Sequence, residues 1–161
     1  MPLFTPDGLQ TDKWTHVSDE EEVPTSGPFT VSLTRWLQEA DTLGARDVQK
    51  GVRLESSDEP ERLAPFLPRL NLVVLHMPTF KDGRAFSQAR LLRTRFRFRG
   101  QIRVTGHVVA DQFKYLLRCG VDSVELGPNA VVESWKRTLE HQTLFYQGSA
   151  RGAGLRARSS D

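Results

Sequence analysis

The sequence predicts an α/β fold with a mostly parallel sheet, built from about five strand–helix units. Short apolar runs that favour β-strands alternate along the chain with segments whose apolar residues recur at helical spacing. One run, Leu72-Val73-Val74-Leu75, is continuously apolar, which is typical of a parallel strand buried on both faces. Five units are too few for a closed eight-stranded barrel, so we expect an open three-layer sheet or a half-barrel.

The expected strands are five short runs: Phe29–Leu33, Val52–Glu55, Leu72–Met77, Ile102–Thr105 and Ser123–Leu126. A helix is expected after each of them. Asp58 is a candidate N-cap, and Pro65 should keep the helix after it short. Apolar residues at helical spacing predict three further helices: Ala85–Phe96, Ala110–Cys119 and Asn129–His141.

The two ends of the chain differ in composition from residues 28–147, which are expected to form a single α/β domain. Residues 1–27 contain the run Asp19-Glu20-Glu21-Glu22 and several turn-forming residues, so an irregular acidic lead-in is predicted. Residues 148–161 are rich in Gly, Ala, Arg and Ser. Because this segment has little to bury, a disordered basic tail is predicted.

The composition narrows the class of protein. Of the 161 residues, 38% are hydrophobic and 26% are charged, as in ordinary globular domains. No run approaches the roughly 18 apolar residues of a membrane span, and the N-terminus lacks the pattern of a secretory signal. The one cysteine, Cys119, fits a reducing compartment. These features predict a cytoplasmic protein without membrane association.

The charge is distributed unevenly, although the net value is only +2. Residues 1–68 hold 6 Lys or Arg and 13 Asp or Glu, whereas residues 69–161 hold 16 and 7. A basic half is typical of proteins that bind an anionic partner. The alternative is a solvated basic face that the acidic half balances.

Ligands of parallel α/β folds bind beyond the carboxyl ends of the strands. Seven polar or turn-forming residues are expected at that rim: Lys81, Asp82, Gly83 and Arg84 after the central strand, and His107, Asp111 and Gln112 after the next. Basic side chains beside helix N-termini favour an oxyanion, and Arg90 and Arg93 would extend the basic set. Asp82, His107 and Asp111 are the acid–base candidates, although either carboxylate could serve only as a helix cap.

The sequence lacks the motifs of several common cofactor, metal and catalytic sites. No P-loop, no dinucleotide-binding glycine motif after a strand, no nucleophile elbow and no Cys/His metal cluster occurs, so we expect no cofactor and no metal. Arg95, Arg97 and Arg99 alternate with Phe96 and Phe98, a pattern that can bind nucleic acid. The same phenylalanines are equally suited to anchoring a helix end in the core.

An ordered series of short motifs resembles one bacterial family. The motifs are the D-G-R-A-F-S-Q-A-R segment from Asp82 to Arg90, then Asp111-Gln112, then Arg118-Cys119-Gly120. Together they resemble the family catalogued as domain of unknown function 934, over roughly residues 28–147. The resemblance implies a protein encoded beside assimilatory sulfite reductase and described as an oxidoreductase of sulfite reduction, with no established active site.

The resemblance favours an auxiliary protein of sulfite reduction that binds an oxyanion, or sulfite reductase itself, through the basic rim. One alternative is an enzyme, such as an oxidoreductase, acting on a small sulfur-containing or phosphorylated anion. A second is a basic nucleic-acid-binding protein. The chain departs from the family at Arg97, which replaces a usual glycine, and at His107, which replaces a usual aspartate. An arginine at 97 costs about 1 kcal/mol if its φ is positive.

Overall fold

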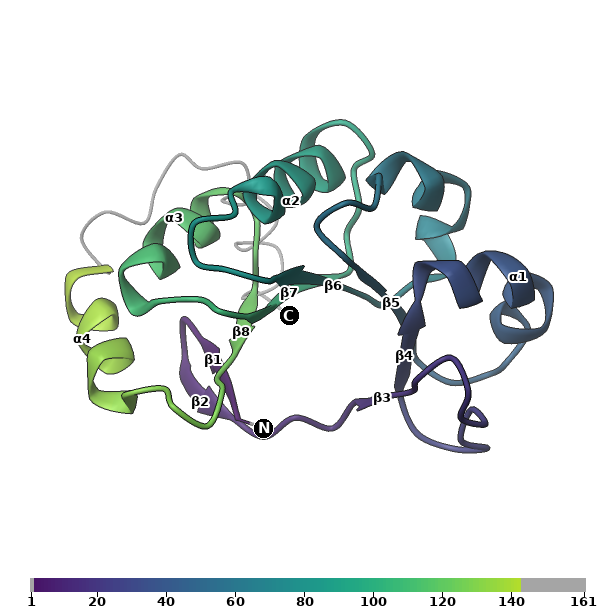
Figure 1. Cartoon of the computed structure of the whole chain (residues 1–161), viewed down its shortest axis with the longest axis horizontal. Coiled ribbons are helices and arrows are strands. Elements are labelled where there is room, and N and C mark those ends of the chain that lie inside the picture. Colours follow the sequence, from purple (N-terminus) through teal and green to yellow (C-terminus); the bar gives the residue numbers. More distant parts are fainter. Residues whose placement is uncertain (1, 143–161) are drawn as a thin grey trace.

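The computed structural model describes residues 2–142, and the tail predicted at 148–161 lies outside them. Its sheet has eight strands in the order β2-β1-β8-β7-β6-β5-β4-β3. Five of these run parallel in chain order: β4 (Phe29–Ser32), β5 (Lys50–Leu54), β6 (Leu72–Met77), β7 (Gln101–Gly106) and β8 (Ser123–Glu125). The sheet curls into a half-barrel (Figure 1), which confirms the α/β class and excludes the three-layer alternative.

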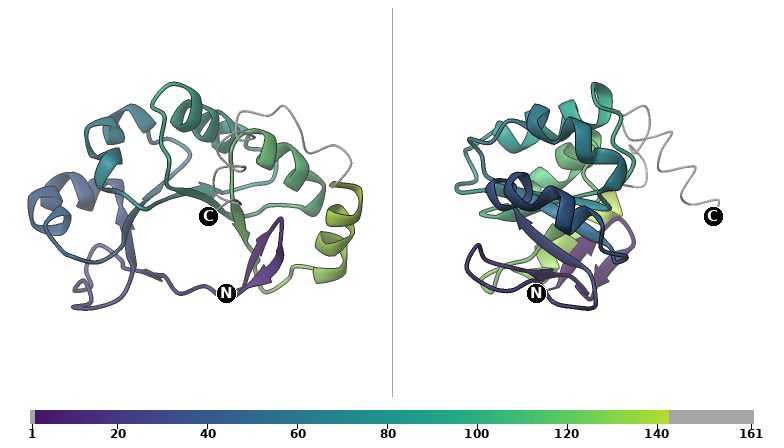
Figure 2. Two further views of the ribbon diagram at one scale, coloured as in Figure 1. Left: turned by 180° about the vertical axis from the view of Figure 1, so that it is seen from behind. Right: turned by 90° about the vertical axis from the view of Figure 1, so that its right-hand side faces the viewer.

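Helical segments follow the parallel strands and cover the outer, convex face of the sheet (Figures 1 and 2). They are α1 (Leu33–Gly44), the 3₁₀ helix η1 (Pro60–Arg69), α2 (Arg84–Thr94), the 3₁₀ turn η2 (Ala110–Gln112), α3 (Phe113–Arg118) and α4 (Val132–Gln142). The helix expected after Asp58 is a 3₁₀ helix, in which Pro65 and Pro68 lack the N–H groups of a regular α-helix. None of the described helices is long and apolar enough to span a membrane.

Alternate strand residues face the two sides of the curled sheet. Val52 and Leu54 are fully buried in the core beneath the helices, whereas Arg53 between them lines a cavity on the concave side. Ile102 and Val104 repeat this pattern around Arg103 in β7. Because successive strand residues point to opposite faces, helices on one side alone leave the concave side available to polar residues.

The prediction of an irregular lead-in over residues 1–27 is wrong for three short segments, which belong to the sheet. They are β1 (Leu3–Thr5), β2 (Gly8–Gln10) and β3 (Thr15–His16). β1 pairs antiparallel with β8, and β3 pairs parallel with β4 at the far edge. Strands of two or three residues are too short to show a periodic pattern in the sequence.

Because β2 and β3 lie at opposite edges of the sheet, residues 11–14 between them cross the opening of the half-barrel (Figure 1).

The turn after α2 confirms one expectation from the sequence. Arg97 has φ of 54°, in the left-handed region that favours glycine. The turn brings Phe98 back to the core, where its N–H donates to the Leu92 carbonyl at 2.8 Å and its side chain is buried. Phe98 thus anchors a helix end, which is the structural alternative to the nucleic-acid interpretation of this segment.

Candidate functional site

The rim after β6 holds four of the predicted site residues, and two of them bind each other. Both carboxylate oxygens of Asp82 accept hydrogen bonds from the Arg84 guanidinium, at 3.0 and 2.9 Å, and Oδ1 also accepts from the Arg84 backbone N–H. These bonds from Arg84 lower the pKa of Asp82 to about 2. Such a carboxylate is ionised at neutral pH and is a poor proton donor or acceptor there. Gly83 lies at the N-cap of α2, and Lys81 is exposed.

The rim after β7 holds the other three predicted residues. The side-chain amide of Gln112 donates to the Phe80 carbonyl at 2.8 Å, and its oxygen accepts from the Val109 N–H at 3.1 Å. Gln112 therefore ties the two rim loops together. His107 and Asp111 are exposed. The structure thus places these residues on two neighbouring loops, where Lys81, His107 and Asp111 are exposed.

Arg90 and Arg93 belong to α2 and lie away from this rim, where their side chains contact segments that follow the helix. Arg93 donates to the carbonyls of Phe98, Gly100 and Gly120 and binds the Asp122 carboxylate at 2.7 Å, with only 8% of its side chain exposed. Arg90 contacts Tyr115 and the buried Cys119 on the outer helical layer. Arg93 is therefore a structural residue that joins α2 to the amino ends of β7 and β8.

A second group of polar residues, which the sequence analysis missed, lies on the concave face of the sheet. Strand register places one residue from each parallel strand in a single row: Ser32, Arg53, Val74, Arg103 and Ser123. Two arginines thus flank one valine. Neighbouring strands are about 4.8 Å apart, so the two Cα atoms are about 10 Å apart. Long guanidinium side chains span such a distance toward a common point.

The middle three residues of the row, Arg53, Val74 and Arg103, line a cavity of about 220 Å³ inside the half-barrel, which we call the inner cavity. Its charged lining consists of Arg53 and Arg103 from the sheet, Glu125 from β8 and Asp12 from the crossing segment. Thr30 and Thr105 add hydroxyl groups, and Trp14 and His16 complete the side formed by the N-terminal residues. Two cations and two carboxylates therefore share one partly open cavity.

Arg103 is the most buried cation of this cavity, with 4% of its side chain exposed. Its Nη1 donates to Asp12 at 3.0 Å, a contact between residues 91 positions apart. Its Nε is buried and has no hydrogen-bond partner. A buried guanidinium with an unused donor is costly, because its lost hydration is only partly replaced.

Arg53 is held in a similar way on the other side of Val74. Its Nη2 lies 3.0 Å from Nδ1 of His76, and its Nε is 3.5 Å from Glu55 without a hydrogen bond. Since a guanidinium only donates, Nδ1 of His76 must accept, and the ring is neutral with its proton on Nε2. Burial lowers the pKa of His76, and the charge of Arg53 lowers it further.

The pKa of His16, in β3, is lowered in the same way. Its Nδ1 is 2.9 Å from the Thr30 hydroxyl. Burial lowers the pKa of His16, and Arg53 is the next cause. Both histidines near the inner cavity therefore take up a proton less readily than a histidine in water, as expected for rings that are partly desolvated and lie near the positive charge of Arg53.

A sequence signal for this site existed in the strands themselves. Arg53 and Arg103 each lie between two residues that the helices bury, and an arginine in the middle of a buried parallel strand requires a polar environment on the other face. The partners Asp12, Trp14 and His16 had no comparable signal, because only the curl of the sheet brings residues 11–16 over it. Among the described residues no cluster of His, Cys, Asp and Glu fits a metal ion.

Residues 51–154 match the family described as bacterial protein of unknown function, DUF934. The chain belongs to this family. The matched region runs from β5 beyond α4 and includes Arg53 and Arg103, whereas Asp12, Trp14 and His16 lie outside it. No curated protein matches the chain significantly.

Proposed function

We propose that this DUF934 protein binds a small oxyanion in its inner cavity and acts as an auxiliary protein of sulfite reduction. The observation that carries the first part is that Arg53 and Arg103, each with a buried Nε that has no hydrogen-bond partner, line the same cavity. An oxyanion between the two guanidinium groups would accept hydrogen bonds from their N–H groups and offset their positive charge. Hydrogen bonds between charged groups are the strongest that a protein makes.

The ligand has to compete with a carboxylate that the protein itself supplies. Asp12 binds Nη1 of Arg103, so it occupies part of the position that an oxyanion would take. Asp12 belongs to the crossing segment, whose Trp14 N–H donates to the same carboxylate oxygen at 2.9 Å. An oxyanion that displaces Asp12 would therefore also loosen residues 11–14. Glu125 also opposes binding, because its carboxylate repels any anion in the cavity, so the attraction has to come from the two arginines.

The second part of the proposal, sulfite reduction, depends on the family resemblance. Sulfite carries the charge and the oxygen acceptors that the two arginines require. The exposed Lys81 and the exposed Phe80 beside it supply a rim surface for a partner such as sulfite reductase. A basic rim surface would make such a contact weaker at high salt.

Calorimetric titration with sulfite, sulfate and phosphate tests anion binding. We expect saturable binding of a divalent oxyanion, which Arg53→Gln weakens at least severalfold. Arg84→Gln is the matched control, because it removes an arginine that is exposed and already paired with Asp82. Equal affinities for the two variants, or no binding to the wild type, would refute the proposed site.

A deletion strain tests the role in sulfur metabolism. A bacterium that lacks this protein should grow with sulfide as sole sulfur source and grow poorly with sulfite. Complementation with the wild-type gene should restore growth, and complementation with Arg53→Gln should restore it less well. Equal growth of the deletion strain on both sources would contradict a role in sulfite reduction while leaving anion binding intact.

A further inference from the structure

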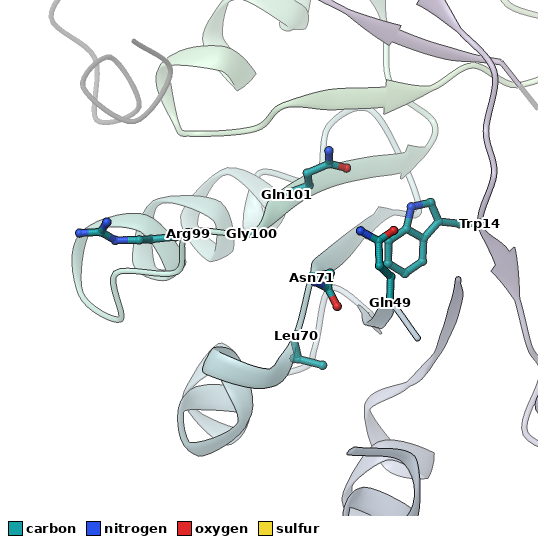
Figure 3. A pocket seen from close by; sticks show the side chains of 7 residues that line it. All are labelled: Trp14, Gln49, Leu70, Asn71, Arg99, Gly100 and Gln101. Atoms are coloured by element: carbon teal, nitrogen blue, oxygen red, sulfur yellow. The ribbon is translucent and has the colours of Figure 1, made fainter. Parts of the chain in front are cut away.

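A second cavity, of about 430 Å³, opens where β5, β6 and β7 begin (Figure 3). We call it the amino-end cavity. Trp14, Gln49, Asn71 and Gln101 contribute to its lining, and Figure 3 shows Arg99 pointing away from them. Trp14 also lines the inner cavity, so one residue borders both spaces. The two cavities are therefore neighbours along the barrel.

Two strands carry the same pair of polar groups from one cavity to the other. Gln101 and Arg103 project from the same face of β7, because they are two residues apart. Gln49 precedes β5 by one residue and shares the parity of Arg53. A side-chain amide thus lines the amino-end cavity and a guanidinium lines the inner cavity on both strands. Along β7 the two Cα atoms are about 7 Å apart.

The chemistry of the amino-end cavity suits a flat ring that forms hydrogen bonds. An indole ring stacks on planar heterocycles, and a primary amide offers both donors and an acceptor to a ring edge. Among the described residues, the side chains of Gln49 and Gln101 form no hydrogen bond that would occupy them. Asn71 is different, since its side-chain oxygen accepts from the Lys50 N–H.

Size also indicates that a ligand larger than a simple ion would extend beyond the inner cavity. Small-molecule sites usually measure about 300–1,000 Å³. The inner cavity, at about 220 Å³, is below that range, and it suits a simple ion. With the amino-end cavity of about 430 Å³ added, the site falls well within the range.

We infer that the ligand is a phosphate or sulfate ester whose body is a flat heterocycle, as in a nucleoside monophosphate. Its anionic group binds between Arg53 and Arg103, and its ring stacks on Trp14 with its edge toward Gln49 and Gln101. This inference rests on the proposed function, because it uses the same arginine pair for the anion.

The test compares AMP with ribose 5-phosphate, which carries the same anionic group without the ring, and with sulfate. Calorimetry should show that AMP binds about tenfold more tightly than ribose 5-phosphate, the advantage expected from stacking one base. Trp14→Leu should remove this advantage and leave the affinity for ribose 5-phosphate unchanged. Trp14→Phe is the matched control, because it keeps a flat ring, and it should retain most of the advantage.

The possible failures are distinguishable. If AMP and ribose 5-phosphate bind equally and Arg53→Gln weakens both, the oxyanion site stands and the ring subsite is refuted. If neither ester nor sulfate binds, the proposed function fails as well. If Trp14→Leu does not fold, Gln101→Ala replaces it, and a preference for AMP that is unchanged in Gln101→Ala would refute the inference.

Discussion

The carboxyl-end rim and the inner cavity contain the same kinds of charged residue in opposite circumstances. At the rim, Asp82 binds Arg84, two residues further along the chain, and 61% of the Arg84 side chain is exposed. In the inner cavity, Arg103 is almost fully buried and pairs with Asp12 from the other end of the chain. A charge in water needs little from the protein, whereas a buried charge with an unused donor has a strong requirement for a partner. The difference indicates that the concave face, rather than the rim, is the better candidate for binding.

The largest expected effect separates arginines that hold the fold from those that are available to a ligand. Arg93→Gln should lower the free energy of unfolding by about 3–5 kcal/mol, because it leaves Asp122 as a buried carboxylate without its ion pair. Urea denaturation of both proteins measures the change. Arg84→Gln, at an exposed arginine, is the control and should hardly alter stability. A similar small loss for both variants would contradict a structural role for Arg93.

Arg103→Gln tests the inner cavity directly. We expect it to weaken binding of sulfate by about 10- to 100-fold, which corresponds to the roughly 1.5–3 kcal/mol of a hydrogen bond to a charged group. The titration is made on protein whose folding has been checked by circular dichroism. If Arg84→Gln weakened sulfate binding as much as Arg103→Gln, the inner cavity would no longer be a better candidate for anion binding than the rim.

Asp12→Asn changes the same cavity in the opposite direction. It removes the internal carboxylate that competes for Arg103, so sulfate should bind about tenfold more tightly, or about 1.4 kcal/mol. Asp82→Asn is the counterpart at the rim and should leave the affinity unchanged. Weaker binding by Asp12→Asn would show that Asp12 orients Arg103 for the ligand rather than competing with it.

The smallest effect concerns pH. The pKa of His76 is lowered in the folded protein by burial and by the nearby charges of Arg53 and His107, which Glu55 partly opposes. The unfolded chain therefore takes up this proton more readily, so stability is full above the ordinary histidine pKa of about 6.5 and falls as the pH drops below it. His76→Asn should make the fall in melting temperature between pH 8 and pH 5.5 shallower. An identical slope in both proteins would contradict the lowered pKa of His76.

Much of the scaffold was predictable because it is encoded by local patterns. All five parallel strands were expected within about two residues of their observed bounds, and the left-handed turn at Arg97 followed from the family pattern and the constraint on φ. The rim residues also follow the strands as expected. The contacts of the Arg93 side chain were not predictable. Helical spacing does not show which face of α2 meets the carbonyls of Phe98, Gly100 and Gly120.

By itself, the sequence determined the alternation of strands and helices, and with it a parallel sheet, since periodicity and turn residues act over a few positions. Only the tertiary structure decided how strongly the sheet curls, that β1 and β3 extend its two edges, and that residues 11–14 cross the opening. The inner cavity depends on all three. The contact between Asp12 and Arg103 joins residues that no local pattern relates, and it exists because the curled sheet brings its two edges within reach of one short segment.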